Sequence, residues 1–492
     1  DEVGVGKTIE TGIILKEYER RENVNNVIIV CPKELSTKWQ REMHYKFDED
    51  FVIINGKDFK TIAWECDCDG EWPSSYSKCI IGLETLRRDA NMKALAGLAD
   101  YLHFDMLIVD EAHHAINAKT SSRAAVNTLS EFSEAAVFLS ATPIQLGSKD
   151  LYSLLNMLLP EEFYDPKLFE QMASSNKKIN AAIRAIRNVR NESWRQDAAE
   201  ALGRLPETNE WARSRYEGNK QVDQWKEKLS STDPFTDEER ISCLRDLEGL
   251  HAFSHVLNRT KRRDIGSFTT RDPQTELIKY NAAEYAFYKA AHDYAANTYS
   301  QSNSSYTTKM IMANIERLIT SCLPAFAQVL EEFIARGQFS VNELSDTLSE
   351  EDYTESTSNM AIDAESLRYL ASQLPEEDSK TKKLLELVNK TIDDSENGKL
   401  LIFSFFKHTL RYLKKKLQAT GARVELIMGD TKPEDRDRIR DRFRLPKEDP
   451  DAIDILLSSE VGCEGLDYEF CSRMVNYDIP WNPMKIEQRI GR

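Results

Sequence analysis

The sequence has no excess of glycine or proline and no long apolar run. Its 492 residues include 19 glycines and 15 prolines, an ordinary globular composition with 41% hydrophobic and 30% charged residues. No stretch approaches the roughly 20 uninterrupted apolar residues that a membrane span requires, so we expect no membrane association. The length allows about three domains of ordinary size.

Cysteine is also scarce, with eight residues scattered at positions 31, 66, 68, 79, 243, 322, 463 and 471. Cys66, Cys68 and Cys79 would supply three zinc ligands, but their spacing matches no common zinc ribbon and a fourth ligand is missing. We therefore expect reduced thiols in a cytoplasmic protein. An initiator methionine is absent too, and the first motif begins before Asp1, so we expect a fragment of a longer protein.

Positive charge is in deficit, since the net charge is −17. Residues 342–378 alone contribute −10, because they hold eleven acidic residues and a single basic one, Arg368. We expect this segment to be a solvated, partly disordered insert. The remaining charge of −7 leaves room for a local basic cleft, so the net charge does not exclude a nucleic-acid partner.

The first ten residues, DEVGVGKTIE, contain the G-x-G-K-T end of a phosphate-binding loop. Its glycines allow successive backbone N–H groups to point at one anion. The lysine would reach the β- and γ-phosphates of ATP, and the threonine hydroxyl would bind Mg²⁺. The expected nucleotide-binding residues here are Gly4, Val5, Gly6, Lys7 and Thr8. The motif alone is equally compatible with a chance glycine-rich turn, so a partner carboxylate is needed.

A partner carboxylate follows the continuous apolar run Phe104–Val109. Asp110 is placed to hold Mg²⁺ through water, and Glu111 is placed to orient and deprotonate the attacking water. The alternative is a strand that ends in a solvated acidic turn. Together with Lys7 upstream, the pair favours an ATP hydrolase.

Short runs rich in valine and isoleucine alternate with helix-like stretches in the first and last parts of the chain. This pattern indicates an α/β fold of mostly parallel sheets covered by helices on both faces, with ligands at the carboxyl ends of the strands. The expected strands are Val27–Cys31, Phe51–Asn55, Cys79–Leu83, Met106–Asp110, Val137–Ser140, Leu400–Phe406, Val424–Met428, Ile453–Ser458 and Met474–Asp478.

Residues 146–256 lose this rhythm and become helical. Ile179, Ile183 and Ile186 recur at helical spacing, while Arg184, Arg187 and Arg190 line another face. Such a basic stripe is usually a solvated face, and the alternative is a surface that follows a DNA backbone.

Seven ordered blocks resemble the Swi/Snf-type ATPases of helicase superfamily II. The blocks are residues 30–42, 80–88, 110–113 (Asp-Glu-Ala-His), 139–145, 257–288, 429–467 and 478–492. The resemblance implies two RecA-like lobes with helical insertions, ATP as the substrate nucleotide and Mg²⁺ as its cofactor. Where chromatin remodellers usually carry Gly-Gly-x-Gly-Leu-Asn, this chain has Gly-Cys-Glu-Gly-Leu-Asp. That sequence is closer to bacterial RapA-type ATPases and to helicase-like proteins of phage-defence systems.

The resemblance also assigns expected roles to individual residues. Arg492 matches an arginine finger, while Gln145, Gly465, Asp467 and Arg489 would contact or relay to the nucleotide. His113 would link the nucleotide to the DNA-facing surface. Backbone contacts with nucleic acid are expected from Lys33, Thr85 and Ser458, and Trp39 is expected to be a core aromatic.

These observations predict four segments. They are a first RecA-like lobe (1–145), a helical insertion (146–270), a linker and helical region with the acidic insert (271–378) and a second RecA-like lobe (379–492). The expected function is an ATP-driven double-stranded DNA translocase. It would be a monomeric motor in the cytoplasm of a prokaryote, associated with the nucleoid, whose clients are RNA polymerase or phage-defence proteins. A strand-separating helicase and a catalytically silent scaffold are the alternatives.

Overall fold

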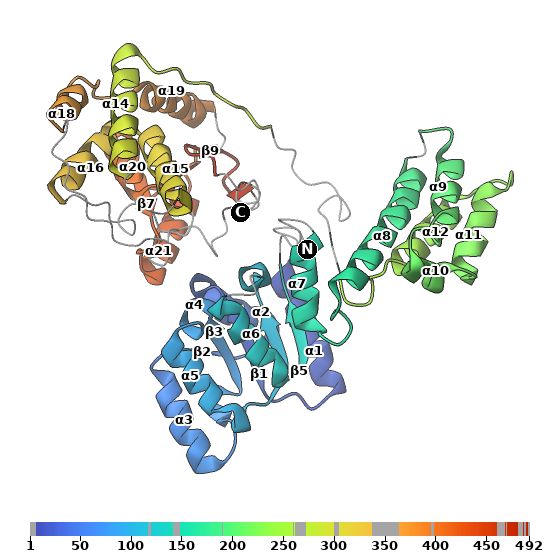
Figure 1. Cartoon of the computed structure of the whole chain (residues 1–492). Helices are drawn as coiled ribbons and strands as arrows, with labels where there is room; N and C mark the ends of the chain where they lie inside the picture. Colours follow the sequence, from blue (N-terminus) through green and yellow to red (C-terminus); the bar gives the residue numbers. More distant parts are fainter. Residues whose placement is uncertain are drawn as a thin grey trace. The chain divides into compact units, whose positions relative to one another are not determined.

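The structure, a computed structural model, describes residues 6–116, 120–140, 148–188, 190–258, 260, 272–299, 305–336, 364–394, 398–459, 468, 470–480, 486, 489 and 490. The chain forms two compact units, residues 1–268 and residues 269–492 (Figure 1). Each unit contains one sheet of parallel strands, which confirms the expected α/β fold class with two RecA-like lobes. The finer boundaries expected at residues 145 and 378 stay predictions.

The first sheet has five strands in the order β2-β3-β1-β4-β5, and all neighbours are parallel. Their bounds are β1 Val27–Cys31, β2 Val52–Ile54, β3 Lys78–Gly82, β4 Phe104–Val109 and β5 Ser133–Phe138. Side chains of β1 alternate between two cores: Val27 and Ile29 enter one, and Ile28 and Val30 enter the other. A strand buried on both faces needs an apolar residue at every position, which is why β1 is recognisable in the sequence.

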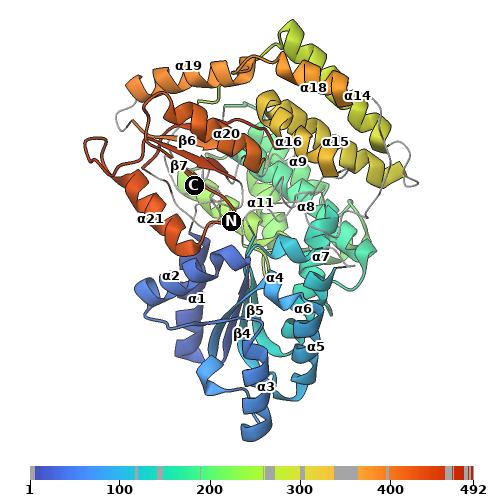
Figure 2. The same ribbon diagram turned by 90° about the vertical axis from the view of Figure 1, so that its left-hand side faces the viewer.

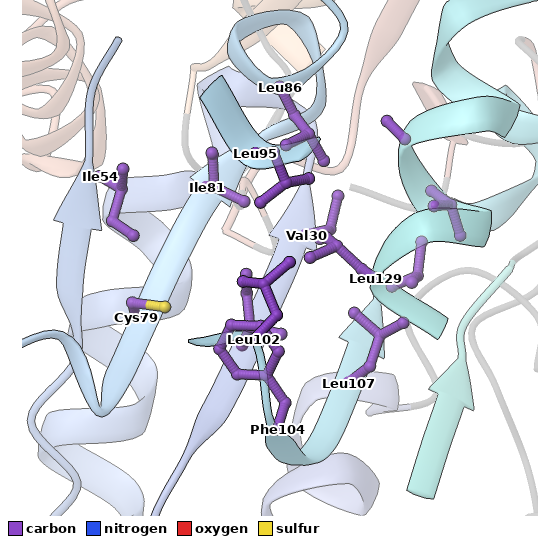
Figure 3. Packing of buried hydrophobic residues seen from close by; sticks show 14 of the residues in the cluster. Val30, Ile54, Cys79, Ile81, Leu86, Leu95, Leu102, Phe104, Leu107 and Leu129 are labelled. Atoms are coloured by element: carbon purple, nitrogen blue, oxygen red, sulfur yellow. The ribbon is translucent and has the colours of Figure 1, made fainter. Parts of the chain in front are cut away.

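Helices cover both faces of this sheet. Figure 2 shows α1 (Lys7–Arg21) and α2 (Ser36–Phe47) on one side of the strands, with α5 (Asp89–Gly97) and α6 (Ser121–Glu131) on the other. Figure 3 shows the second core, where strand residues such as Val30 meet helix residues such as Leu129. The remaining helical segments are η1 Lys33–Leu35, α3 Asp58–Asp69, η2 Ser74–Tyr76, α4 Leu83–Leu86, η3 Ala99–Tyr101, η4 Ala112–Ala115 and α7 Ser148–Leu158.

Helix α1 lies unusually close to α2. A Cβ atom built on Gly12 would lie 2.2 Å from ring carbons of Phe47, well inside any van der Waals contact. Any side chain at position 12 would force the Phe47 ring to shift, so glycine allows α1 to pack directly against that ring.

The helical insertion contains α8 (Pro166–Arg187), α9 (Trp194–Gly203), α10 (Glu210–Tyr216), α11 (Lys220–Ser230) and α12 (Asp237–Gly249). These five helices share a core of their own. As the sequence predicts, Ile179, Ile183 and Ile186 of α8 are buried in it.

The second sheet has four parallel strands in the order β7-β8-β6-β9. Their bounds are β6 Leu400–Phe403, β7 Val424–Ile427, β8 Ile455–Ser458 and β9 Met474–Asn476. The helices of this unit are α14 Ala282–Tyr299, α15 Ser305–Ser321, α16 Leu323–Arg336, α18 Ala364–Ser372, α19 Ser379–Asp394, α20 Lys407–Gln418 and α21 Pro433–Arg444. Leu400 and Ile402 face one core, and Leu401 and Phe403 face the other.

The end of the acidic segment is folded, which corrects the expectation of a solvated insert for residues 364–378. Asp378 is buried and accepts the backbone N–H groups of Leu323 (3.2 Å) and Thr381 (2.8 Å). Glu284, also buried, accepts the N–H of Ser379 at 2.7 Å. These carboxylates satisfy helix N-termini, a role that acidic composition alone does not reveal.

The three cysteines considered as zinc ligands do not converge. Cys66 and Cys79 are free thiols in the first-lobe core, while Cys68 is exposed. Across the described residues, the one group with metal-ligand spacing is His103, Asp105 and Glu134, at the surface near the start of β4. None of the described helices combines the length and apolarity needed to span a membrane.

Candidate nucleotide site

The described part of the phosphate loop ends in the backbone turn that starts α1. Gly6 has φ 91° and ψ 31°, a left-handed conformation that strongly favours glycine. Its carbonyl accepts the N–H of Glu10 at 2.9 Å, so Lys7 and Thr8 occupy the first turn of the helix. Gly4 and Val5 lie outside the described residues. A helix N-terminus presents unpaired N–H groups and a positive dipole end, which suits a phosphate.

Asp110 directly follows β4, which lies between β1 and β5. Its side chain is buried and accepts two hydrogen bonds. The backbone N–H of Glu111 donates to Oδ1 at 2.8 Å, and the indole N–H of Trp39 donates to Oδ2 at 2.9 Å. A carboxylate has about four lone-pair positions, so two acceptor positions remain for another ligand.

Glu111 has a backbone conformation that L-residues rarely adopt, with φ 47° and ψ 45°. Such a conformation costs about 1–3 kcal/mol and persists where the surrounding structure enforces it. Lys7 Nζ lies 3.6 Å from Oε1 of this glutamate, and His113 Nδ1 lies 3.2 Å from Oε2. The same His113 nitrogen lies 3.3 Å from the Ser140 hydroxyl. The strained turn therefore places the Glu111 carboxylate between two basic groups.

The two adjacent carboxylates differ in their electrostatics. Burial tends to raise the pKa of Glu111, but His113 and Lys7 outweigh it and lower that pKa to about 2. Burial also raises the pKa of Asp110, and the Glu111 charge raises it further, against the lowering effect of Lys7 and the Trp39 indole. Glu111 is therefore ionised at neutral pH, whereas burial and the Glu111 charge disfavour the ionised form of Asp110.

A family model described as the SNF2-related domain matches residues 1–323, and the helicase conserved C-terminal domain matches residues 379–492. The chain belongs to the SNF2-related family. It is accordingly an ATP hydrolase of the helicase type. The nucleotide-binding character expected from Lys7 and Asp110 agrees with this family.

Curated relatives match the chain over its whole length. It is 26% identical over 496 residues to "Uncharacterized ATP-dependent helicase YqhH" of Bacillus subtilis, covering 100% of this chain and 68% of that protein. It is 24% identical over 509 residues to "RNA polymerase-associated protein RapA" of Vibrio parahaemolyticus, covering 100% of this chain and 44% of that protein. The chain thus spans less than half of the RapA relative. The solved "Sulfolobus solfataricus SWI2/SNF2 ATPase core in complex with dsDNA" is 17% identical with a TM-score of 0.32, covering 100% of this chain and 80% of that one.

In the second lobe of this SNF2-related chain, Arg489 is the one expected nucleotide-binding residue that lies among the described residues. Its guanidinium is buried, and Nη1 donates to Asn476 Oδ1 at 2.8 Å and to the Asp478 carbonyl at 3.2 Å. It also stacks 5.0 Å from the ring centre of Phe403. These contacts anchor Arg489 to the ends of β6 and β9. Gln145, Gly465, Asp467 and Arg492 lie outside the described residues, and their roles stay predictions.

The three residues expected to contact a nucleic-acid backbone differ in accessibility. Lys33 is exposed, and its backbone N–H donates to Glu84 Oε2 at 2.9 Å, which joins the start of η1 to α4, the helix that carries Thr85. The Thr85 residue is only 8% exposed. Ser458 is fully buried and donates its hydroxyl to the Ser459 carbonyl at 2.8 Å. Of the three, Lys33 alone presents its side chain at the surface.

The basic residues of the helical insertion also divide into two groups. Arg184, Arg187 and Arg190 are all exposed, and Arg187 also forms an ion pair with Glu248 at 2.8 Å. Helix α8 ends at Arg187, so Arg190 lies beyond it, which corrects the expectation of one helical stripe. Arg195 is engaged internally, since it donates to four carbonyl oxygens at the end of α11 and beyond, those of Lys228, Leu229, Ser231 and Asp233. Arg195 is therefore a cap for α11.

Trp39 is buried, as expected of a core aromatic, but its hydrogen bond to Asp110 gives it a place in the nucleotide site. Sequence reasoning missed this contact because the two residues are 71 positions apart. One feature of the sequence could have pointed to this contact. Trp39 lies in the first block that resembles the Swi/Snf family, shortly after β1, and β1 is adjacent to β4.

Proposed function

We propose that the protein is an ATP-driven translocase on double-stranded DNA. The observation that carries the proposal is the convergence of Lys7, Asp110 and Glu111 at the carboxyl end of the first sheet in a chain of the SNF2-related family. A catalytically silent scaffold would tolerate the loss of one of these groups. All three are present, and Lys7 and Glu111 are already paired.

In this proposal Lys7 changes partner when ATP binds. Its ammonium group is 3.6 Å from Glu111 and would move to the β- and γ-phosphates, which carry more negative charge. Glu111 then loses one of its two basic neighbours, so its pKa rises from its low value in the structure. A carboxylate is a better general base when its pKa lies closer to the operating pH. Substrate binding would thereby activate the base that takes a proton from the attacking water.

Asp110 and Thr8 fit the expected role of holding Mg²⁺. Asp110 is a buried carboxylate with acceptor positions remaining, and its ionised form is disfavoured by burial and by the Glu111 charge. Thr8 lies in the first turn of α1. Hard oxygen ligands of this kind suit Mg²⁺, which would neutralise charge on the phosphates. Trp39 and the Glu111 N–H would keep the carboxylate oriented, while Lys7 would bind the phosphates directly.

Double-stranded DNA is the proposed track. The relevant residues at the surface are Lys33 in the first lobe and Arg184 and Arg190 in the helical insertion. Contacts from such cations go to phosphates, which fix position without reading sequence. The proposed client is a protein–DNA complex that includes RNA polymerase, supported by the likeness to RapA. A role in phage defence stays a prediction from the family resemblance.

Displacement of a third strand from a DNA triplex tests the proposal directly. The full-length protein is expected to release the third strand in the presence of ATP and Mg²⁺ while a plain forked duplex stays paired. The Glu111→Gln variant, tested alongside, should release nothing. Failure of the wild-type protein to hydrolyse ATP faster with duplex DNA would refute the translocase proposal.

The second candidate is a strand-separating helicase, which the name of the Bacillus subtilis relative favours. It would use the same ATPase residues and differ in how the strands are held. Single strands are commonly held by exposed aromatic side chains that stack on bases. Tyr285 on α14 is 58% exposed and lies 6.5 Å, ring centre to ring centre, from Tyr288. Efficient unwinding of the forked duplex, weakened by Tyr285→Ala, would establish this alternative.

A further inference from the structure

The contact between Trp39 and Asp110 carries an inference about the nucleotide site, and it rests on the proposed role of Asp110. Trp39 lies on α2 and is 2% exposed, and its indole N–H donates to Asp110 Oδ2 at 2.9 Å. No other side chain among the described residues donates a hydrogen bond to Asp110. The remaining donor is the Glu111 backbone N–H, on the opposite oxygen.

We propose that Trp39 is a positioning residue that fixes the plane of the Asp110 carboxylate for Mg²⁺. The two donors approach different oxygens, so together they prevent rotation of the carboxylate about its Cβ–Cγ bond. With only the Glu111 N–H, the carboxylate could rotate about this bond more easily, and both oxygens would leave the observed orientation together. Residues that orient a metal-binding carboxylate typically change metal affinity or activity by about 10- to 100-fold when removed.

Packing ensures that the indole itself cannot move. Trp39 belongs to the core between α1, α2 and the first sheet, where it is buried with Leu15, Met43 and Ile108. The same helix α2 follows directly after η1, which begins at Lys33. Trp39 is thus fixed by the hydrophobic core on one side and fixes a charged group on the other.

Trp72 provides a matched control in the same lobe. Its indole is also buried, at 6% exposed, and donates one hydrogen bond, to the Tyr76 carbonyl at 3.0 Å. Its ring packs on Phe104, at the opposite end of β4 from Asp110. Trp39→Phe and Trp72→Phe therefore each remove one buried indole N–H and a similar volume. Only the first change touches Asp110.

The test is the Mg²⁺ dependence of ADP binding by the full-length protein, followed with a fluorescent ADP analogue. Trp39→Phe should raise the half-saturating Mg²⁺ concentration about 10-fold and leave binding in EDTA within about twofold of wild type, while Trp72→Phe should keep the wild-type value. Equal Mg²⁺ dependence in wild type and Trp39→Phe would overturn the proposal. Equal losses in both variants, with or without Mg²⁺, would also overturn it in favour of a purely packing role.

The same experiment separates this inference from the proposed function on which it rests. If wild-type protein binds the ADP analogue with no dependence on Mg²⁺, the assignment of Asp110 as a magnesium ligand fails first. If wild type depends on Mg²⁺ and Asp110→Ala abolishes that dependence while Trp39→Phe does not change it, only the role of Trp39 is refuted.

Discussion

Asp110 and Asp478 occupy comparable places in the two lobes but have different surroundings. Asp110 directly follows β4, and Asp478 lies two residues after β9. Asp478 accepts the hydroxyls of Ser321 and Ser404 and the N–H of Phe405, and Lys380 Nζ lies 3.1 Å away. Asp110 accepts two N–H groups and stands beside a second carboxylate.

The pKa values of the two aspartates differ in the same way. Burial raises the pKa of both aspartates, but Lys380 and the serine hydroxyls outweigh burial at Asp478 and lower its pKa, whereas the pKa of Asp110 stays raised. A carboxylate with a full set of donors and a cation has nothing left to bind, so Asp478 holds the second lobe together. Asp110 retains acceptor positions, and its charged form is disfavoured by burial and by the Glu111 charge, so a bound cation would stabilise it.

The largest expected effect is on turnover. Glu111→Gln keeps the shape of the side chain but cannot accept the proton, so ATP hydrolysis should fall by about 100- to 10,000-fold while ATP binding is retained. Steady-state hydrolysis and equilibrium ATP binding measure the two quantities. Glu134→Gln, an exposed glutamate of the same lobe, is the control and should keep full activity. Unchanged turnover in Glu111→Gln would remove this residue from the mechanism.

The second prediction concerns the stability of the second lobe. Asp478→Asn leaves Lys380, whose side chain is 20% exposed, without its charged partner, and should destabilise the second lobe by about 3 kcal/mol. Thermal unfolding followed by circular dichroism measures the loss.

Asp430→Asn is the matched control for Asp478→Asn. It removes a carboxylate that is 57% exposed and lies 3.8 Å from Lys407, an arrangement worth at most about 1 kcal/mol. Similar losses in both variants would contradict the comparison between the two lobes.

The third prediction is the pH dependence of that stability difference. Because the pKa of Asp478 is lowered in the folded protein, its contribution is complete above the ordinary aspartate pKa of about 3.9 and is lost as pH falls through the lowered value. The gap between wild type and Asp478→Asn should therefore be constant from pH 7 to 5 and shrink below about pH 4. If the difference in stability grew as the pH fell, the pKa of Asp478 would not be lowered by folding, and the prediction would be wrong.

The smallest expected effect extends the comparison from carboxylates to guanidinium groups. Arg184 and Arg190 are exposed, so changing both to alanine should flatten the slope of log affinity for duplex DNA against log salt by about 0.9 for each phosphate that is no longer neutralised. Glu248→Ala releases Arg187 from its ion pair and should steepen the slope if that face lies on DNA.

Arg204→Ala, at the C-cap of α9, is the control for these arginine variants, since Arg204 is already paired with Glu200 at 2.6 Å. The wild-type slope in the Arg184 and Arg190 double variant would assign the surface at the end of α8 to an ordinary solvated face.

The sheets could be predicted from the sequence because parallel strands buried on both faces need continuous apolar runs, as in Val27–Cys31. Strand β5 begins at Ser133, earlier than expected, because Ser133 to Ala136 lack the valine and isoleucine by which strands are recognised. That Lys7 and Glu111 lie near each other could be predicted because each follows a recognisable motif, and their role in binding nucleotide stays a prediction.

Other parts of the site depend on contacts between distant segments and leave no local pattern. The side chain that donates to Asp110 is the indole of Trp39, 71 positions away. The apolar character of tryptophan predicts only that it lies in the core. Arg195 is another basic residue of the helical insertion, yet it caps α11 more than 30 positions along the chain. Asp378 is expected to be solvated because it lies in an acidic segment, but in the fold it accepts hydrogen bonds from two backbone N–H groups. In each case tertiary structure decides which partner a polar group finds.

The close packing of Gly12 on Phe47 has a consequence for the evolutionary history of this protein. A methyl group at position 12 would meet the ring at 2.2 Å, so a side chain cannot be added there while the Phe47 ring stays in place. Position 47 is under no such limit, because a smaller residue there leaves room beside Gly12. An alignment of relatives that preserve the fold is therefore expected to show alanine or serine at position 12 only where the residue at position 47 has lost its ring.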